Sequence, residues 1–321
     1  MIWLAVDGLK RGWANVFHRE EKSLAAKRRQ QAAPKGEYAK LLSAAKHGNV
    51  DAQLRLAANY AEGVGVVQDY AEAAHWYSEA AKQGNPDAQY SLGICYANGQ
   101  GAAQDYEEAV NWFRFAAEQG HIGAQVSLAI CLQKALGAFA SPVEAAKWFK
   151  VAGEAGDPAG EMGYAACLLH GNGVKQNETE AVAWFKKAAD QGLGEAEFNL
   201  GKCYQDGVGV APDAVEAFRR FRAAAGQGLP QAEYELALCY AHGRGTTADM
   251  VSAFQWITLA ARRAIPNAEA MKEEWRRQMK FEEVAEAESR LEKMGGAAKI
   301  SAPVEIEGDE VILQAPQEAD V

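Results

Sequence analysis

The sequence predicts an all-α solenoid of 36-residue helix-loop-helix repeats, and three observations lead to this fold class. The composition is rich in alanine, leucine and glutamate and poor in isoleucine and threonine, which favours helix over sheet. The segment that starts at Gly48 aligns without a gap with the one that starts at Gly84, and the same frame continues through four further segments. The cysteines are also spaced 36 residues apart: Cys95, Cys131, Cys167, Cys203 and Cys239. One such hairpin cannot bury its own apolar face, so neighbouring repeats must stack.

Residues 1–36 are expected to form a basic amphipathic helix ahead of the repeats. They contain eight Lys or Arg residues against three Asp or Glu residues. The apolar residues at helical spacing are Ile2, Val6, Leu9, Trp13 and Val16. Three alternatives stay open: the helix docks onto the solenoid or a partner, residues 1–20 contact an anionic membrane surface, or the extension is poorly ordered. Residues 37–47 match only the second half of a repeat, so a half repeat is expected there.

Six full repeats occupy residues 48–263, and each begins with a helix that carries an apolar stripe. The position after the leucine of this stripe always holds alanine or glycine, as at Gly93, and a small residue lets the partner helix approach closely. A Gly-x-Gly loop then supplies the left-handed positions that end the helix in five repeats. The third repeat differs because Ala135 replaces the first of these glycines.

The second helix of each repeat starts with a residue that suits an N-cap: Asp69, Asp105, Ser141, Asn177, Asp213 or Asp249. A glutamate three residues later completes a capping-box pattern in five of the six repeats, which predicts a bond from the cap amide to the glutamate carboxylate. An unvarying alanine follows. Five repeats then carry a tryptophan: Trp76, Trp112, Trp148, Trp184 and Trp256. The fifth repeat has Arg220 at this position.

Two segments follow the repeats. Residues 264–294 are helical in pattern and more charged, as helices that cap a solenoid should be. Residues 295–321 contain one Lys against six acidic residues, and we expect this acidic tail to be disordered.

The recurring positions resemble the Sel-one-like repeat, a relative of the tetratricopeptide repeat. The resemblance covers residues 37 to about 265 and includes the leucine, small residue and tyrosine of the first helix, the glycine loop, and the alanine and tryptophan of the second helix. It implies a right-handed superhelix that serves as a protein-interaction scaffold.

The cysteines are expected to be buried thiols on the inward stripe of the first helices. Equivalent helices of neighbouring repeats lie about 10 Å apart, whereas a disulfide needs Cα atoms within about 7 Å. The Cys-x-x-His pairs 167–170 and 239–242 lie two repeats apart, about 20 Å, so we expect no metal ion to bridge them. The Gly-x-Gly loops join helix to helix, so they do not indicate phosphate binding. We therefore expect no catalytic residues, no metal, no cofactor and no enzymatic activity.

A concave wall of first-helix residues is the candidate binding site. By analogy with tetratricopeptide repeats, the positions two before and two after the leucine should line it, together with residues near the helix end. These positions vary between repeats, as expected for a surface that is free for recognition. The predicted set is Tyr90, Ile94, Asn98, Val126, Ile130, Met162, His170, Phe198, Lys202, Tyr234, Leu238 and His242. The alternative is that these residues are filler between repeats.

The predicted function is that of a non-enzymatic scaffold or adaptor of bacterial type, which binds another protein or a peptide in its concave groove. The alternative is a secretion-associated immunity protein or chaperone for a cognate toxin, and a more distant one is a small-substrate hydrolase. The net charge of -10 argues against nucleic acid as a partner. No apolar run approaches the roughly 18–20 residues of a membrane span, and no secretory signal is evident, so a cytoplasmic location is expected, with membrane association through residues 1–20 as the alternative.

Overall fold

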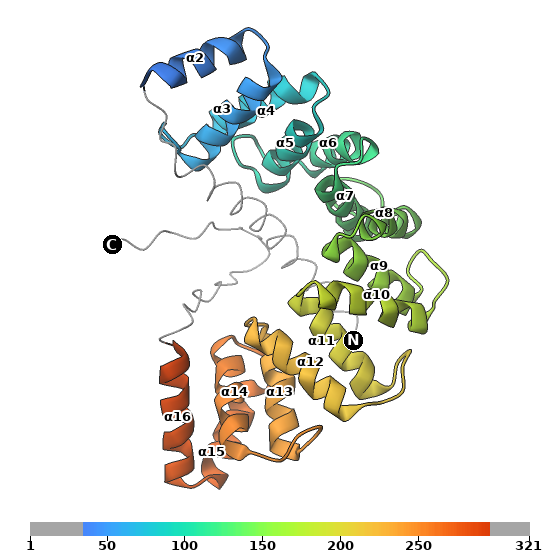
Figure 1. Cartoon of the computed structure of the whole chain (residues 1–321), viewed down its shortest axis with the longest axis vertical. Helices are drawn as coiled ribbons and strands as arrows, with labels where there is room; N and C mark the ends of the chain where they lie inside the picture. Colours follow the sequence, from blue (N-terminus) through green and yellow to red (C-terminus); the bar gives the residue numbers. More distant parts are fainter. Residues whose placement is uncertain (1–34, 296–321) are drawn as a thin grey trace. The chain divides into compact units, whose positions relative to one another are not determined.

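The computed structural model describes residues 35–295 (Figure 1). Nearly all of the extension predicted over residues 1–36 and of the tail predicted over residues 295–321 lies outside the described residues. Within the described part, all regular structure is helical. Of the described residues, 35–196 form one compact unit, called unit 1 here, and 197–295 form unit 2.

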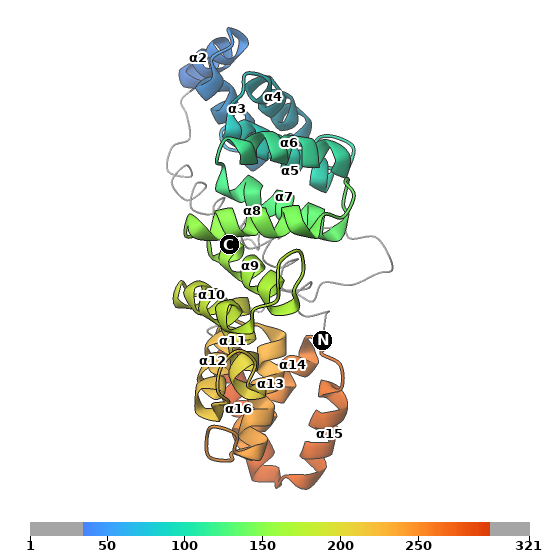
Figure 2. The same cartoon turned by 90° about the vertical axis from the view of Figure 1, so that its right-hand side faces the viewer.

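Unit 1 consists of a single helix followed by helix hairpins. Its helices are α2 (Lys35–Lys46), α3 (Val50–Glu62), α4 (Tyr70–Lys82), α5 (Pro86–Asn98), α6 (Tyr106–Glu118), α7 (Ile122–Lys134), α8 (Pro142–Glu154), α9 (Pro158–His170) and α10 (Glu178–Asp190). The first helices of the repeats form one layer and the second helices form another, so that α6 and α8 lie in front of α5 and α7 when unit 1 is viewed onto its second helices (Figure 2).

Unit 2 continues the same pattern and ends in two extra helices. Its helices are α11 (Gly194–Asp206), which begins in unit 1, α12 (Ala214–Gly226), α13 (Pro230–His242), α14 (Met250–Arg262), α15 (Ala268–Gln278) and α16 (Phe281–Gly295). Each helix from α3 to α14 has 13 residues, which confirms the predicted all-α solenoid of helix-loop-helix repeats. Trp275, Val284 and Ala287 of the last two helices share a buried cluster with α14.

The predicted N-caps are confirmed at five of the six second helices. The side chains of Asp69, Asp105 and Asp213 each accept two backbone N–H bonds from the first turn of their helix, while Asn177 and Asp249 each accept one. Ser141 occupies the cap position but makes no side-chain bond.

The capping-box prediction is wrong for the glutamate half. The Asp69 amide donates instead to the Tyr60 carbonyl, nine residues earlier, at 2.9 Å, and the Asp105 amide donates to Tyr96 in the same way. The hairpin brings the end of the first helix against the start of the second, so the cap amide already has an acceptor. The glutamates are therefore available for other partners.

Phenylalanines fill the centre of the hairpins. Phe113, Phe149, Phe185 and Phe221 each follow the tryptophan position directly and are at most 1 % exposed, whereas Trp112, Trp148 and Trp256 are half-buried. A Cβ atom on Gly93 would lie 2.7 Å from the Phe113 ring, and one on Gly201 would lie 2.7 Å from Phe221. This confirms that the small residue of the first helix makes room for the second helix.

The second glycine of the loop sets the approach of neighbouring repeats. A Cβ atom on Gly101 would lie 1.8 Å from the carbonyl oxygen of Tyr70, the first residue of α4 in the preceding repeat, and Gly137 meets Tyr106 in the same way. Because no side chain fits there, the loop of one repeat lies directly on the helix start of its neighbour. At the first loop position Ala135 adopts a φ of 55°, the left-handed conformation that glycine adopts in the other repeats.

The cysteines confirm the prediction of buried thiols. All five are described, all are at most 7 % exposed, and no disulfide joins any of them. Burial raises the pKa of Cys131 and of Cys167 to about 12 and that of Cys239 to about 11. These three side chains are therefore neutral thiols at physiological pH and act as small apolar groups.

Candidate functional site on the first helices

The structure divides the twelve predicted wall residues into two groups. Two are exposed and five are half-buried: His170, His242, Ile94, Asn98, Lys202, Tyr234 and Leu238. The other five are at most 7 % exposed: Tyr90, Val126, Ile130, Met162 and Phe198. The prediction that these five residues line an accessible wall is therefore wrong, because a buried side chain offers no surface to a partner.

Aromatic packing explains two of the buried positions. The Tyr90 ring lies 5.9 Å from the Phe113 ring of its own repeat and 4.3 Å from the His121 imidazole of the next, measured between centroids. The Phe198 ring lies 5.8 Å from Phe221 in the same manner. At Tyr90 and Phe198 the position two before the leucine thus points toward the second helix and belongs to the core.

In unit 2 an ion pair joins one predicted residue of α11 to α13, the helix that carries two more of them. The Lys202 ammonium lies 3.3 Å from the Glu235 carboxylate, and Gln205 accepts a bond from Lys202 and donates to Glu235 at 3.4 Å. Tyr234 and Leu238 flank Glu235 on α13 and are half-buried. We call Lys202, Gln205, Tyr234, Glu235 and Leu238 the α11–α13 patch. It combines apolar surface with a charged, hydrogen-bonded rim.

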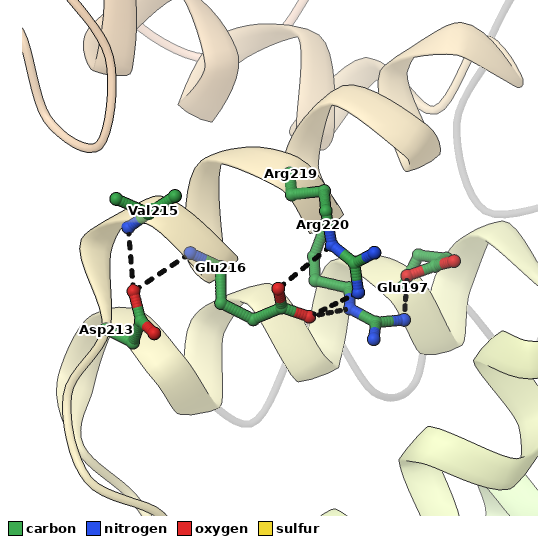
Figure 3. A network of polar contacts seen from close by, with 6 residues as sticks. All are labelled: Glu197, Asp213, Val215, Glu216, Arg219 and Arg220. Atoms are coloured by element: carbon green, nitrogen blue, oxygen red, sulfur yellow. Dashed lines mark hydrogen bonds and ion pairs between the residues drawn. The ribbon is translucent and has the colours of Figure 1, made fainter.

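An ion network centred on a buried arginine occupies the place where the fifth repeat lacks tryptophan (Figure 3). Arg220 is 6 % exposed, and its guanidinium donates to the Glu216 carboxylate at 2.7 Å and to the Glu197 carboxylate at 2.9 Å. Arg219 also donates to Glu216, and Asp213 caps the same helix. Figure 3 shows Glu197 on the neighbouring helix α11, so the network ties α11 to α12.

The acidic and basic groups of this network each favour the charged form of the other. Hydrogen bonds from Arg219, and then from Arg220, hold the pKa of Glu216 below its ordinary value. Burial acts to lower the pKa of Arg220, but the bonds to Glu197 and Glu216 outweigh it, and the net pKa is raised. Both partners therefore stay charged at neutral pH, and the group acts as a structural clamp.

A column of buried polar residues was not predicted. It lies three residues before the leucine position of each first helix and comprises the buried Gln53, Gln89, Gln125, Glu161 and Glu233, with Glu197 half-buried at the equivalent position. In unit 1 the amide of Gln83 donates to Gln53 at 2.7 Å, that of Gln119 to Gln89 at 2.7 Å, and that of Gln191 to Glu161 at 2.8 Å. The recurrence of glutamine every 36 residues was the available signal. Because glutamine is polar, a search for apolar stripes does not indicate that this position is buried.

Unit 1 also contains a cavity of about 760 Å³ between α2, α3 and α4. Tyr38 and Tyr60 line it with their hydroxyl groups 2.7 Å apart, and this bond is the main cause that raises the pKa of Tyr60 to about 12. Asp69 and Trp76 contribute to the lining, and the buried Trp76 indole N–H has no acceptor. No nucleophile and base are paired there, so the cavity has no evident catalytic chemistry.

Two features are absent from the described residues. No group of three His, Cys, Asp or Glu side chains between residues 35 and 295 is placed to hold a metal ion. In the same part of the chain no helix is both long enough and apolar enough to cross a membrane.

Comparisons with known proteins agree with the fold. The family profile described as Sel1 repeat matches residues 50–85, 86–121, 122–157, 158–193, 194–229 and 230–264. None of the curated protein sequences compared with the chain is significantly similar to it.

Solved structures provide the closer comparison. A Sel1 repeat protein from Oxalobacter formigenes is 28 % identical with a TM-score of 0.63, over 80 % of this chain and 96 % of the other. The protein c5321 of uropathogenic Escherichia coli, described as a protective antigen with an SLR fold, is 28 % identical with a TM-score of 0.68 over 79 % of this chain. This chain spans 56 % of the length of c5321. Immunity protein Pa5087 of Pseudomonas aeruginosa is 18 % identical with a TM-score of 0.44, too low to support an argument about function.

Six consecutive profile matches, which together cover more than half of the chain, agree with the repeats seen in the structure. The chain therefore belongs to the Sel1-repeat family.

Proposed function

We propose that the chain is a non-enzymatic scaffold that binds another protein through the α11–α13 patch. Members of repeat families of this kind offer extended surfaces to protein partners. The supporting observation is the contrast between positions. The alanine three residues before the tryptophan position is buried and identical in all six repeats, whereas Lys202 and Leu238 occupy the same position in successive repeats and differ in charge and polarity while staying half-buried.

The composition of the patch fits a protein interface. Tyr234 and Leu238 supply apolar surface of the kind found at interface centres, and the pair Lys202–Glu235 supplies a polar rim. The ion pair and the Gln205 bonds hold the lysine in one position before a partner arrives. Such preorganisation lowers the entropy cost of binding.

Co-purification of the tagged full-length chain from its own host, followed by titration calorimetry with the purified partner, tests this proposal. We expect Leu238→Asp and Lys202→Glu each to weaken the affinity by at least about tenfold, because an unpaired charge would face the interface. Val215→Asp is the matched control, since Val215 is 66 % exposed on α12 and lies outside the patch. Melting curves of all three variants report whether the fold is intact. Unchanged affinity in well-folded Leu238→Asp and Lys202→Glu would refute the proposal.

A triple alanine variant of the aromatic residues Tyr90, Phe198 and Tyr234 would not separate a loss of partner binding from a loss of stability. Tyr90 is 7 % exposed and Phe198 is 5 % exposed, so their truncation removes core packing. A loss of binding in that variant would reflect a loss of stability.

A further inference from the structure

Helix α7 is buried on every side. All ten residues from Gly123 to Leu132 are buried. Successive residues of an α-helix point about 100° apart, so ten consecutive residues sample every direction around the axis. A first helix in a two-layer repeat array should instead keep one stripe accessible, on the side away from the second helices.

The neighbouring repeat shows the accessible stripe. On α5, Ser91 and Ile94 are half-buried. Their equivalents on α7, one repeat later, are Ser127 at 1 % and Ile130 at 3 % exposure. The helix α5 packs against α4 and α6, and α7 packs against α6 and α8, so both have the same kind of neighbours. The second helices therefore do not account for the difference.

The burial continues on α9. The equivalent of Ile94 in that repeat is Ala166, which is 8 % exposed, and all residues from Ala159 to Leu168 are buried. The face that α7 and α9 share is defined here by Ile130 and Ala166 and is called the covered face. It is apolar, and it requires an occupant that lies on the first-helix layer.

We propose that residues 1–34 of the same chain occupy the covered face. This segment is joined directly to α2, at the start of unit 1. Its apolar residues Ile2, Val6, Leu9, Trp13 and Val16 recur at helical spacing, which provides an apolar surface of matching character. A helix rises about 1.5 Å per residue and helices pack about 8–10 Å apart, so 34 residues are long enough to reach α7 and α9 from α2.

Charge supports the same occupant. Residues 1–36 contain eight basic and three acidic residues, whereas the whole chain has a net charge of -10. The segment and the remainder of the chain therefore attract each other. Attachment in the same chain also raises the effective concentration to the millimolar range, which strengthens a weak contact.

The covered face belongs to unit 1. Its occupancy does not depend on the proposed partner site in unit 2. Its test uses no partner, so failure here and failure of the binding experiment are distinguishable.

The experiment compares the rate of maleimide labelling at a cysteine introduced in two equivalent positions of the full-length chain, Ile130→Cys and Ile94→Cys. Peptide mass spectrometry separates the introduced cysteine from the five buried native ones. We expect Ile130→Cys to react at least about tenfold more slowly than Ile94→Cys, because a covered thiol reacts only after local opening. Addition of Leu9→Asp and Trp13→Asp should remove the difference by accelerating Ile130→Cys alone.

Two controls keep the result unambiguous. Asn15→Asp with His18→Asp adds the same charge to the opposite side of the helical pattern and should leave both rates unchanged. Ala166→Cys repeats the test on α9 if Ile130→Cys lowers the melting temperature. Equal labelling of Ile130→Cys and Ile94→Cys in the otherwise unaltered chain would overturn the proposal. Slow labelling of Ile130→Cys that persists in the presence of Leu9→Asp and Trp13→Asp would also overturn it. In that case, a labelling rate that depends on protein concentration would identify a second copy of the chain as the occupant.

Discussion

In the polar column of unit 1, one repeat lacks the glutamine that donates a hydrogen bond to the column residue in other repeats. Gln53 and Gln89 each accept a bond from the glutamine that ends the second helix of the same repeat. In the third repeat Ala155 stands at that position, and the buried Oε1 of Gln125 has no donor. Because an unpaired buried acceptor loses its hydration without compensation, this site is a local weakness.

Ala155→Gln should therefore stabilise the protein by about 1 kcal/mol, by providing the missing donor to Gln125. Ala155 has φ -77° and ψ 0°, close to φ -83° and ψ 3° at Gln83, so the backbone already suits the new side chain. Urea unfolding measures the change. Ala155→Leu, which has no donor, should give no gain, and an equal gain in both variants would contradict the hydrogen-bond explanation.

His121 makes the stability of unit 1 depend on pH. Its Nδ1 accepts the Ala124 amide at 3.1 Å and caps α7, its ring stacks on Tyr90, and its Nε2 lies 3.6 Å from the Asp87 carboxylate. Burial lowers the pKa of His121, and Asp87 opposes this only in part. The unfolded chain therefore binds the proton more readily, so stability is lost as the pH falls below the unfolded pKa of about 6.5.

His121→Asn should remove this dependence, because asparagine caps the equivalent helices at Asn49 and Asn85 without titrating near neutral pH. When the pH is lowered from 7.5 to 5.5, we expect the unaltered protein to lose more stability than the variant. Asp157 and Glu161 have pKa values raised by burial and favour the folded state in acid, but they are present in both proteins and cancel. A pH-independent difference would refute the role of His121.

At the scale of elements, the fifth repeat joins its two helices by charge where other repeats use an aromatic side chain. Arg220 replaces the tryptophan, and Glu197 replaces the glutamine of the column in the first three repeats. The guanidinium satisfies Glu197 on α11 and Glu216 on α12 at once. The two replacements are therefore coupled, since the half-buried Glu197 carboxylate without the arginine would lack a counter-charge.

Arg220→Met should destabilise the protein by about 3–5 kcal/mol, because it leaves Glu197 and Glu216 without their buried partner. The double change Arg220→Trp with Glu197→Gln restores the residues of the other repeats and should recover most of that loss. Denaturant unfolding of the two variants gives the comparison. A double variant as unstable as Arg220→Met would show that the network is not a simple substitute for aromatic packing.

At the scale of the whole molecule, stability depends on contacts between successive repeats, since no hairpin buries its own face. The contact of Gly101 with Tyr70 is one such joint in unit 1. Gly84 also has a positive φ, of 87°, but a Cβ atom there would meet nothing within 4 Å. Substitutions at the two glycines therefore distinguish the cost of backbone strain from the cost of disturbing the contact between repeats.

Gly84→Ala should cost about 1–2 kcal/mol, the penalty of a left-handed backbone for an L-residue. Gly101→Ala should cost more than about 4 kcal/mol, because the added Cβ atom also forces the first two repeats apart. Thermal melting and hydrogen exchange of α3 and α4 report the loss. Equal effects of the two substitutions would show that the joint has enough room to relax.

The sequence by itself determined the repeat length, the helix hairpins, the N-caps and the buried thiols. These features depend on local propensity and on a period that is visible within one chain. The tertiary structure decided which residues the partner helices cover. Tyr90 and Phe198 carry the spacing of a wall residue, yet both are buried against phenylalanines of the second helix. The Asp69 amide bonds to Tyr60 instead of Glu72 for the same reason. Burial and hydrogen-bond partners depend on neighbours from other helices, and a pattern along one helix does not contain them.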